Sequence, residues 1–227
     1  MNRESFPFPK APWGSGLSSF LAVVEDHWDE VVRATALASW MTVQPAGSVV
    51  ALEPSSGRLQ PAEYSSGFRD RPRLYRVRHQ MPDRWHVEEV DARGSVVRRE
   101  AFGSDRRWST GPSGTHVDSH DMAQSEVRRQ ISPCDLLHPR WVFEAGHPRF
   151  ISQVAGRLSV EVIPEGRSHA VLPGWEGATA FNLIVDVSTG LGHELAATYE
   201  GRILRVQRLR EIVYDPDLDS SLFEPPA

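Results

Sequence analysis

Between residues 17 and 41, apolar side chains recur at spacings of three and four, a pattern typical of an amphipathic helix. The apolar positions are Leu17, Phe20, Leu21, Val24, Trp28, Val31, Thr35, Ala38 and Met41. Charged residues fall on the other side, and Ser15, Ser18 and Ser19 are candidate N-caps. About 25 residues at 1.5 Å each predict a helix of roughly 35–40 Å, whose apolar stripe has to pack on something large.

Two groups of residues alternate between apolar and polar side chains with a period of two, which predicts β-strands. The first group predicts strands at 73–80, 84–91, 95–102 and 106–110. The second group predicts strands at 150–154, 157–163, 180–187, 192–200 and 202–214. Gly, Asp and Pro residues fall between successive strands, so each group is expected to form an antiparallel meander.

The segments between these groups lack a strong period. Residues 42–72 are rich in Gly, Pro and Ser, and the only element indicated there is a short strand around 48–52. Residues 111–129 are polar, and the stretch "QSEVRRQ" predicts a short helix. Ser132 and Pro133 then begin a helical segment near 133–144, which is expected to hold one or two turns.

The last predicted strand, 202–214, is long enough to require curvature. Thirteen residues at about 3.3 Å each extend roughly 40 Å. Leu204 and Val206 share a face, but Leu209 has the opposite parity, which predicts a β-bulge near Gln207 and Arg208. Antiparallel strands that curve together form an open trough or partial barrel.

These elements predict one α+β domain at 17–227, preceded by an irregular Pro- and Gly-rich arm at 1–16. Its fold class is a strongly curved antiparallel sheet of about nine or ten strands, a half-open barrel. A long N-terminal helix and a short mid-chain helix are expected to cover it. Such an arrangement has an apolar interior, and the pattern alone leaves open whether that interior is filled or hollow.

The charge balance argues against a nucleic-acid partner. The net charge is −5 and the pI about 6.0. Lysine occurs once among the 25 basic residues, an arginine bias that indicates a GC-rich genome of the actinobacterial kind. Arg76 and Arg78 share one strand face, where Glu88, Glu89 and Glu100 on neighbouring strands favour cross-strand pairing. Contact with a charged headgroup is the alternative.

Cysteine content and hydropathy indicate the cellular compartment of the protein. The single Cys134 excludes an intramolecular disulfide and is expected to pack as a small hydrophobe. No run approaches the 18 or so apolar residues of a membrane span, so no transmembrane segment is predicted. Residues 1–16 lack the basic and apolar regions of a secretory signal. The sequence as written therefore predicts a cytoplasmic protein, or an exported one if the N-terminus has been trimmed.

Several short motifs occur in one order along the chain. The C-terminal residues among them are Asp186, Thr189, Gly190, Leu191, Glu194, Tyr199, Gly201, Leu218, Phe223 and Pro225. The upstream motifs are "RPRLYRVRHQMPDRWHVEEVD", "SDRRWSTGPSG" and "VAGRLSVEVIP". In this order they resemble the lipoprotein-carrier superfamily, and the likeness covers roughly residues 70–225. The group includes LolA-like periplasmic carriers, RseB-like stress sensors and mycobacterial lipid-transport lipoproteins.

This resemblance implies a half-open antiparallel barrel closed by helices, with an apolar cavity that takes acyl chains. Members are typically exported, whereas this sequence shows no signal. The basic residues with which LolA-like carriers engage a membrane donor have no identifiable counterpart here.

Aromatic and aliphatic residues are the candidate wall of that cavity. They are Trp28, Tyr75, Val77, Trp85, Phe102, Trp108, Trp141, Phe143, Leu183 and Val185. Seven tryptophans are many for this length, and large rings lining a concavity suit an acyl or isoprenoid ligand. Plain core packing is the alternative, and the sequence favours neither.

Candidate chemistry is sparse. In "THVDSHDM", His116, Asp118 and His120 have spacings that suit Zn²⁺, but Pro112 and Gly114 flank the stretch, which indicates a solvated polar loop. No G-x-S-x-G motif is present, and the glycines of "STGLGHE" precede a strand rather than a helix. We therefore predict no metal, no cofactor and no catalysis.

Two functional hypotheses follow. The first is non-enzymatic binding or carriage of a hydrophobic ligand, such as a lipid, acyl chain or lipidated group, between the sheet and its helices. The second is an RseB-like sensor or regulatory module that acts through protein–protein contact. The first needs space inside the fold, whereas the second expects a filled core and an exposed apolar patch.

Overall fold

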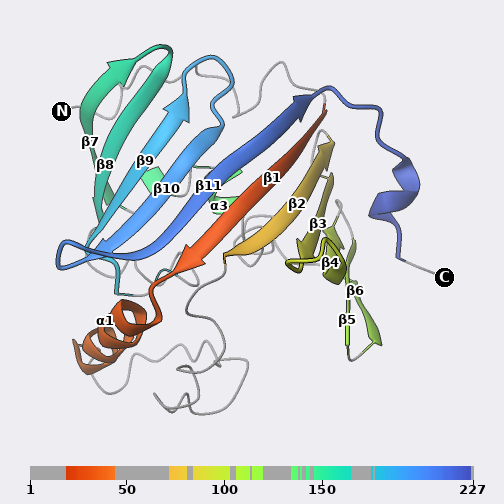
Figure 1. Ribbon diagram of the computed structural model, residues 1–227, viewed down its shortest axis with the longest axis horizontal. Helices are drawn as coiled ribbons and strands as arrows, with labels where there is room; N and C mark the ends of the chain where they lie inside the picture. The colour runs from red at the N-terminus through yellow and green to blue at the C-terminus, as the bar shows by residue number, and fades with distance from the viewer. Residues whose placement is uncertain are drawn as a thin grey trace.

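The computed structural model describes residues 19–43, 72–80, 84–102, 106–112, 114–119, 134–137, 139, 142–143, 146–164, 175 and 177–225. In these ranges, one antiparallel sheet of eleven strands dominates (Figure 1). Its strands are β1 (Ser19–Trp28), β2 (Arg73–Gln80), β3 (Arg84–Val90), β4 (Val96–Phe102), β5 (Arg106–Gly111), β6 (Gly114–Ser119), β7 (Gly146–Val154), β8 (Arg157–Pro164), β9 (Ala180–Asp186), β10 (Gly192–Tyr199) and β11 (Arg202–Tyr214). The described helices are α1 (Glu30–Val43), α3 (Cys134–Leu137) and the 3₁₀ helix η3 (Ser220–Phe223).

The sheet is open, with the order β6-β5-β4-β3-β2-β1-β11-β10-β9-β8-β7. The predicted open antiparallel sheet is therefore confirmed, with β6 and β7 at its edges. Its two wings are the meanders β2–β6 and β7–β11, and β1 joins them by pairing with β2 and β11. Figure 1 shows the β3–β6 wing turned edge-on while β7–β11 face the viewer, so the sheet bends across its width.

The predicted helix at 17–41 is wrong over its first half, because residues 19–28 form β1. Phe20, Ala22, Val24 and Asp26 are buried at every second position, the period of a strand. The helix begins only after Asp29, whose Oδ1 accepts the N–H groups of Val31 and Val32 at 3.1 and 3.0 Å. Asp29 is thus the N-cap, in place of the serines considered from the sequence.

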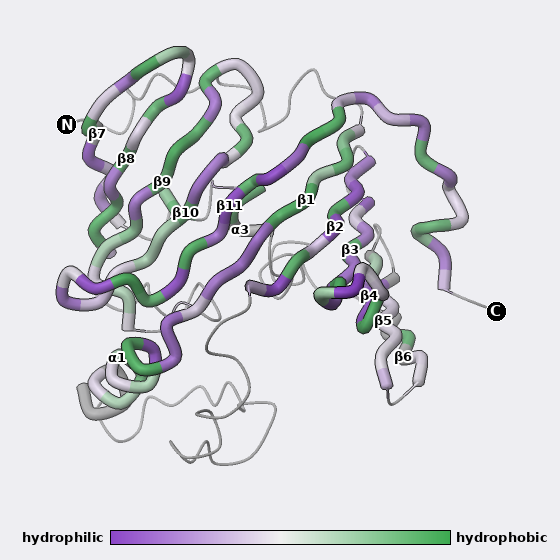
Figure 2. The backbone as a smooth tube through the Cα atoms, in the orientation of Figure 1, coloured by the Kyte–Doolittle hydropathy of each residue, from purple (hydrophilic) through white to green (hydrophobic). Residues whose placement is uncertain are grey.

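The sheet has two faces. The strand register shows which residues lie on each face, because directly paired residues point to the same side. The inner face carries Ala22 of β1, Val77 of β2 and Leu195 of β10, and the buried residues of α1 and α3 belong to the same core. The outer face carries the intervening residues. Hydrophobic and hydrophilic positions alternate along most strands accordingly (Figure 2).

The C-terminal segment returns to the outer face of the β3–β4 region, where η3 packs. The indole Nε1 of Trp108 donates a hydrogen bond to the carbonyl oxygen of Phe223 at 3.2 Å. The His86 ring lies 5.9 Å from the Trp108 ring, between centroids, and completes this small second core. The segment after β11 therefore covers the wing that is distant from it in sequence.

Most strand predictions are confirmed within one or two residues, and β2 and β11 match at both ends. Residues 114–119 form β6, although a polar loop was predicted there. The bulge in β11 against β1 leaves Arg210 unpaired between Leu209 and Glu211, slightly beyond its predicted place. α3 falls inside the predicted 133–144 segment, whereas the helix predicted at 124–130 lies outside the described residues. No described helix is long and apolar enough to span a membrane.

Candidate binding surface on the inner face

The inner face carries apolar side chains from β8 to β3, interrupted on β11 by the polar Arg205 and Gln207. Its fully buried members are Ala22, Val24, Val77, Leu158, Val160, Val162, Phe181, Leu183, Val185, Leu195 and Ala197. Side chains from successive strands lie side by side, because Ala22 is paired with Val77 and Leu195 with Leu183. This surface is the natural candidate for binding an apolar ligand.

The two described helices on this face approach the sheet and its loops at backbone distance. A Cβ added at Gly177, where φ is +82°, would lie 2.6 Å from the carbonyl oxygen of Ala36 in α1. A Cβ at Gly192 of β10 would meet the carbonyl oxygen of Leu136 in α3. Each glycine is therefore required by a neighbouring helix, and α1 and α3 are fixed rather than loosely placed.

Near α1, the apolar surface ends in a buried polar cluster. The guanidinium of Arg205 donates from Nε to Asp26 Oδ1 at 2.8 Å and from Nη2 to Asp26 Oδ2 at 2.5 Å. Gln207 Nε2 adds a third, longer hydrogen bond to Asp26 Oδ2 at 3.4 Å. Arg205 and Asp26 are each only 1% exposed. The pair is formed because Trp28 and Asp26 of β1 lie opposite Arg205 and Gln207 of β11.

Two tryptophans enclose the Arg205 guanidinium. Its Cζ lies 4.1 Å from the centroid of Trp28 and 4.2 Å from that of Trp175. Arg33 of α1 also lies over Trp28, at 4.2 Å. Desolvated cation–π contacts of this kind contribute about 2 kcal/mol each. The cluster therefore attaches the start of α1 and the Trp175 segment to the sheet, with help from the Asp29 N–H, which donates to Leu204 O at 3.0 Å.

Tyr75 joins the apolar surface to this cluster. It is buried on β2 directly opposite Val24. Burial raises the pKa of the Tyr75 hydroxyl, and the nearby carboxylates of Asp26 and Glu89 raise it further. The hydroxyl is consequently neutral at physiological pH.

The residues predicted as a cavity wall do not form one surface. Tyr75, Val77 and Trp85 lie together on the inner face of β2 and β3, and Leu183 and Val185 lie on the inner face of β9. Trp28 and Phe143 pack half-buried against the core. Trp108 lies on the outer face under η3, because Ala101 and His86 are its neighbours in register. The Phe102 side chain and Trp141 lie outside the described residues.

The apolar surface is filled at several of these positions. Val77, Leu183 and Val185 are 0% exposed, so no space that admits water lies against them. Along β11 the situation differs, because Leu209 and Ile212 of the inner face are only partly buried. They continue the row of Val24 and Ala22, their partners in β1. At the β1–β11 seam, the inner face is therefore partly accessible.

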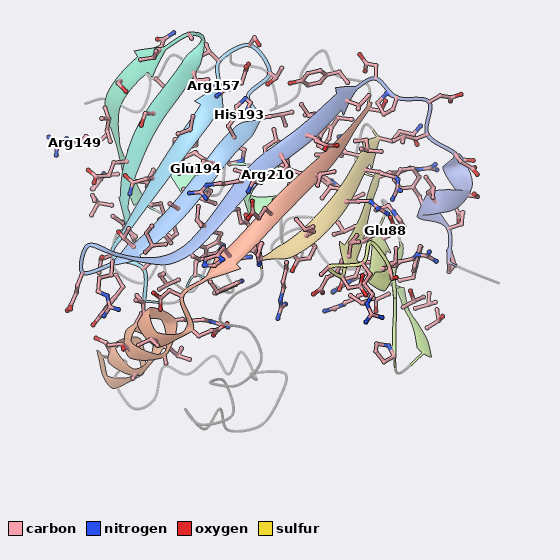
Figure 3. The ribbon with its side chains drawn as sticks, viewed as in Figure 1. Glu88, Arg149, Arg157, His193, Glu194 and Arg210 are labelled. Carbon is pink, nitrogen blue, oxygen red and sulfur yellow. The ribbon has the colours of Figure 1, made fainter. Side chains whose placement is uncertain are left out.

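The outer face carries a band of ion pairs that includes Glu88, Glu194 and Arg210 (Figure 3). Arg78 pairs with Glu88 at 2.9 Å and Arg208 with Glu194 at 2.8 Å, and Arg210 contacts Glu25. Burial alone would raise the pKa of Glu88, but the hydrogen bond and charge of Arg78 outweigh it and lower that pKa. The predicted pairing of Arg78 with Glu88 is confirmed.

Glu89 and Glu100 were expected on the same face, but both point to the inner side. There they pair with Arg73, Arg98 and Arg107. Among the described residues no group of three His, Cys, Asp or Glu side chains could hold a metal. His120 and the side chains of His116 and Asp118 lie outside that description.

Sequence reasoning missed the cluster of Asp26, Arg205, Gln207 and Trp175. Asp26 had been assigned to the polar side of a helix, where a carboxylate needs no partner. With residues 19–28 taken as a strand, Asp26 falls in the same row as Phe20, Ala22 and Val24, which would have marked it as buried. A buried carboxylate then requires a cationic partner.

No protein-family model and no curated protein matches this chain. Solved structures do. An uncharacterized conserved protein from Thermus thermophilus is 8% identical, with a TM-score of 0.47, 91% of this chain covered and 83% of the other. The MucA/MucB complex of Pseudomonas aeruginosa matches at 13% identity and a TM-score of 0.46, with coverage of 91% and 55%. A LolA superfamily protein from Nitrosomonas europaea matches at 11% identity and a TM-score of 0.36, with coverage of 94% and 98%.

The solved structures that this chain resembles thus include MucB and a LolA superfamily protein, the groups that the sequence resemblance also names. The chain spans only about half of the matched chain in the MucA/MucB complex. At these identities and TM-scores the likeness concerns the fold alone, and residue roles have to come from the contacts of this chain.

Proposed function

We propose that the protein binds an elongated hydrophobic ligand, a lipid, acyl chain or lipidated group, on the inner face of the sheet without changing it chemically. The observation that carries the proposal is the row of apolar side chains at the β1–β11 seam. Ala22 and Val24 are buried in this row, while Leu209 and Ile212 beside them remain partly accessible. A ligand chain lying along the seam would continue the core.

Burial of apolar area drives such binding. Each methylene taken out of water contributes about 0.8 kcal/mol before the costs of association. The described helices approach β10 and β11 closely, and neither approaches β2 comparably. The ligand therefore belongs beside Leu209 and Ile212, away from Val77, Leu183 and Val185.

A matched pair of variants tests this placement. Ile212→Glu puts a charge on the inner face, and Val213→Glu puts the same charge one residue away on the outer face. Both positions tolerate the change, because Ile212 is partly buried and Val213 is 52% exposed. A dansyl-labelled undecanoic acid is titrated into each protein, and native mass spectrometry records any lipid that is retained on purification.

The proposal expects at least tenfold weaker probe binding for Ile212→Glu and unchanged binding for Val213→Glu. Equal binding by both variants, or no probe binding and no retained lipid in the unsubstituted protein, would overturn it. Circular dichroism checks that each variant is folded before binding is compared.

A second candidate function, contact with a protein partner, is supported by the filled part of the core. Val77, Leu183 and Val185 leave no free volume against them, while apolar side chains such as Val154 and Val213 are exposed. A module that works through its surface needs no hollow interior. The lipid experiment and a partner-binding experiment separate the two functions.

A further inference from the structure

Strand β11 extends beyond the end of its neighbour β10. β10 pairs with β11 from Arg202 to Arg208, whereas β1 pairs with it from Arg205 to Tyr214. Residues 209–214 therefore have β1 on one edge, and on the other edge no strand pairs with them within the described ranges. Figure 1 shows this part of β11 running past the start of β10.

The backbone of this segment directs hydrogen-bonding groups toward the open edge. The Asp215 N–H donates to Ser19 O at 2.9 Å, on the β1 side. The Tyr214 C=O belongs to the same trans peptide and points the opposite way, away from β1. Because sides alternate along a strand, the N–H and C=O groups of Ile212 point outward as well.

The edge strand β7 is protected against strand addition. β7 contains Pro148, which has no N–H to donate, and a bulge between Phe150 and Ser152. The open part of β11 has no proline, and its Val213 and Tyr214 are 52% and 42% exposed. On this edge, added backbone hydrogen bonds and apolar contacts coincide.

We propose that an extended peptide of a partner protein adds to this edge as a short antiparallel strand. The inference rests on the second candidate function, protein contact, and assigns that contact to the open edge of β11. Apolar residues of the peptide face Ile212 and Tyr214 on the inner side. A basic residue faces Glu211 on the outer side, because Glu211 is exposed and has no ion pair within the described ranges.

The segment sets the size of this partner peptide. Six residues extend about 20 Å, so four to six peptide residues fill the edge. In strand addition the backbone hydrogen bonds supply affinity and the alternate side chains supply specificity. Expected sequences therefore carry consecutive β-branched or aromatic residues followed by Lys or Arg, as antiparallel pairing with Tyr214 through Glu211 requires.

The test selects binders from a phage-displayed library of random octapeptides, using the full chain as bait. A selected peptide is then synthesised with a fluorophore and titrated by fluorescence polarisation. Tyr214→Pro removes the outward N–H, and Tyr214→Ala keeps it while removing the ring. We expect Tyr214→Pro to weaken binding at least tenfold and Tyr214→Ala to weaken it less. Glu211→Lys should shift selection toward acidic peptides.

Three outcomes would overturn the inference: no enrichment of extended apolar–basic sequences, equal binding by Tyr214→Pro, or a dimer in sedimentation that Tyr214→Pro dissociates. The last outcome would assign the edge to a second copy of the chain. Protein contact as a function would survive if selected peptides bound equally well to the Tyr214→Pro variant, because they would then use another surface. Lipid binding is measured separately and is unaffected by either result.

Discussion

Arg205 and Asp26 face each other across the β11–β1 pair and form a two-point ion pair that is almost wholly shielded from water. Trp28 and Trp175 lie on the two sides of the guanidinium. The pair joins the strand that starts the described sheet to the strand that ends it. Its loss would therefore weaken the seam between the two wings.

Arg205→Leu should destabilise the fold by about 3–5 kcal/mol, because it leaves the Asp26 carboxylate buried without its cation. Urea unfolding followed by tryptophan fluorescence measures this change. Combining Asp26→Leu with Arg205→Met should recover most of the loss, since neither charge then remains. Arg208→Ala breaks an exposed pair with Glu194 and should cost less than about 1 kcal/mol. A cost for Arg205→Leu no larger than that for Arg208→Ala would contradict the argument.

Gly192→Ala should lower stability by about 1–3 kcal/mol, because the new methyl group meets the backbone of Leu136 and pushes α3 from the sheet. The control is Gly111→Ala, where an added Cβ has open space and the backbone has no positive φ. Thermal unfolding by circular dichroism compares the two. Equal melting temperatures would show that α3 is not held at this contact.

Acid should weaken the fold through His86. Burial and the neighbouring Arg78 charge lower the pKa of this histidine to about 4 from 6.5. The unfolded chain therefore binds the proton more readily, so the stabilising contribution is complete above pH 6.5 and is lost progressively as pH falls toward 4. Urea midpoints between pH 7.5 and 4.5 should decrease less in His86→Gln.

Burial, and then the charge of Arg157, also lowers the pKa of His193, so it acts in the same direction as His86. The pH series is therefore repeated with His193→Gln and with both substitutions. If His86→Gln alone leaves the dependence of the urea midpoint on pH unchanged, the titration of His86 is not coupled to folding.

Ala155→Asn should stabilise the β7–β8 hairpin by about 0.5–1 kcal/mol. Ala155 has φ 50° and Gly156 φ 75°, the left-handed pair that a two-residue type I′ turn requires. Asn tolerates this conformation better than Ala, whereas Ala155→Val should destabilise, because a β-branched side chain is strained there. Chemical denaturation of the three proteins gives the order of their free energies of unfolding. An Ala155→Val variant at least as stable as the unsubstituted protein would refute the prediction.

Much of the sheet is predictable, because each strand of the two meanders is local and bounded by turn residues. The turn at Asp186 is an example of such a local structure. The Asp186 Oδ1 accepts the Ser188 and Thr189 N–H groups at 2.8 and 2.9 Å, and Gly190 has φ 73°, a conformation that glycine adopts at no steric cost. Such interactions lie within a few residues, where side-chain type alone selects the geometry.

The candidate site was harder to predict, because its parts are distant in sequence. β1 and α1 are separated by a single residue, Asp29, so a period of two followed by a helical period mimicked one long helix. Trp108 was assigned to the wall because it is large and apolar, but strand register places it on the outer face. The Arg205–Asp26 pair joins residues 179 positions apart, which no local pattern reveals.

The pairing of β1 with β11 also determines how late in synthesis the sheet can be completed. Ser19 and Asp215 bond across 196 positions, so the middle of the sheet closes only after β11 has left the ribosome. Until then β1 has a bare edge, and the β2–β6 wing has formed beside it. A nascent chain should therefore aggregate most readily just before β11 emerges, and slowed translation there should increase aggregation.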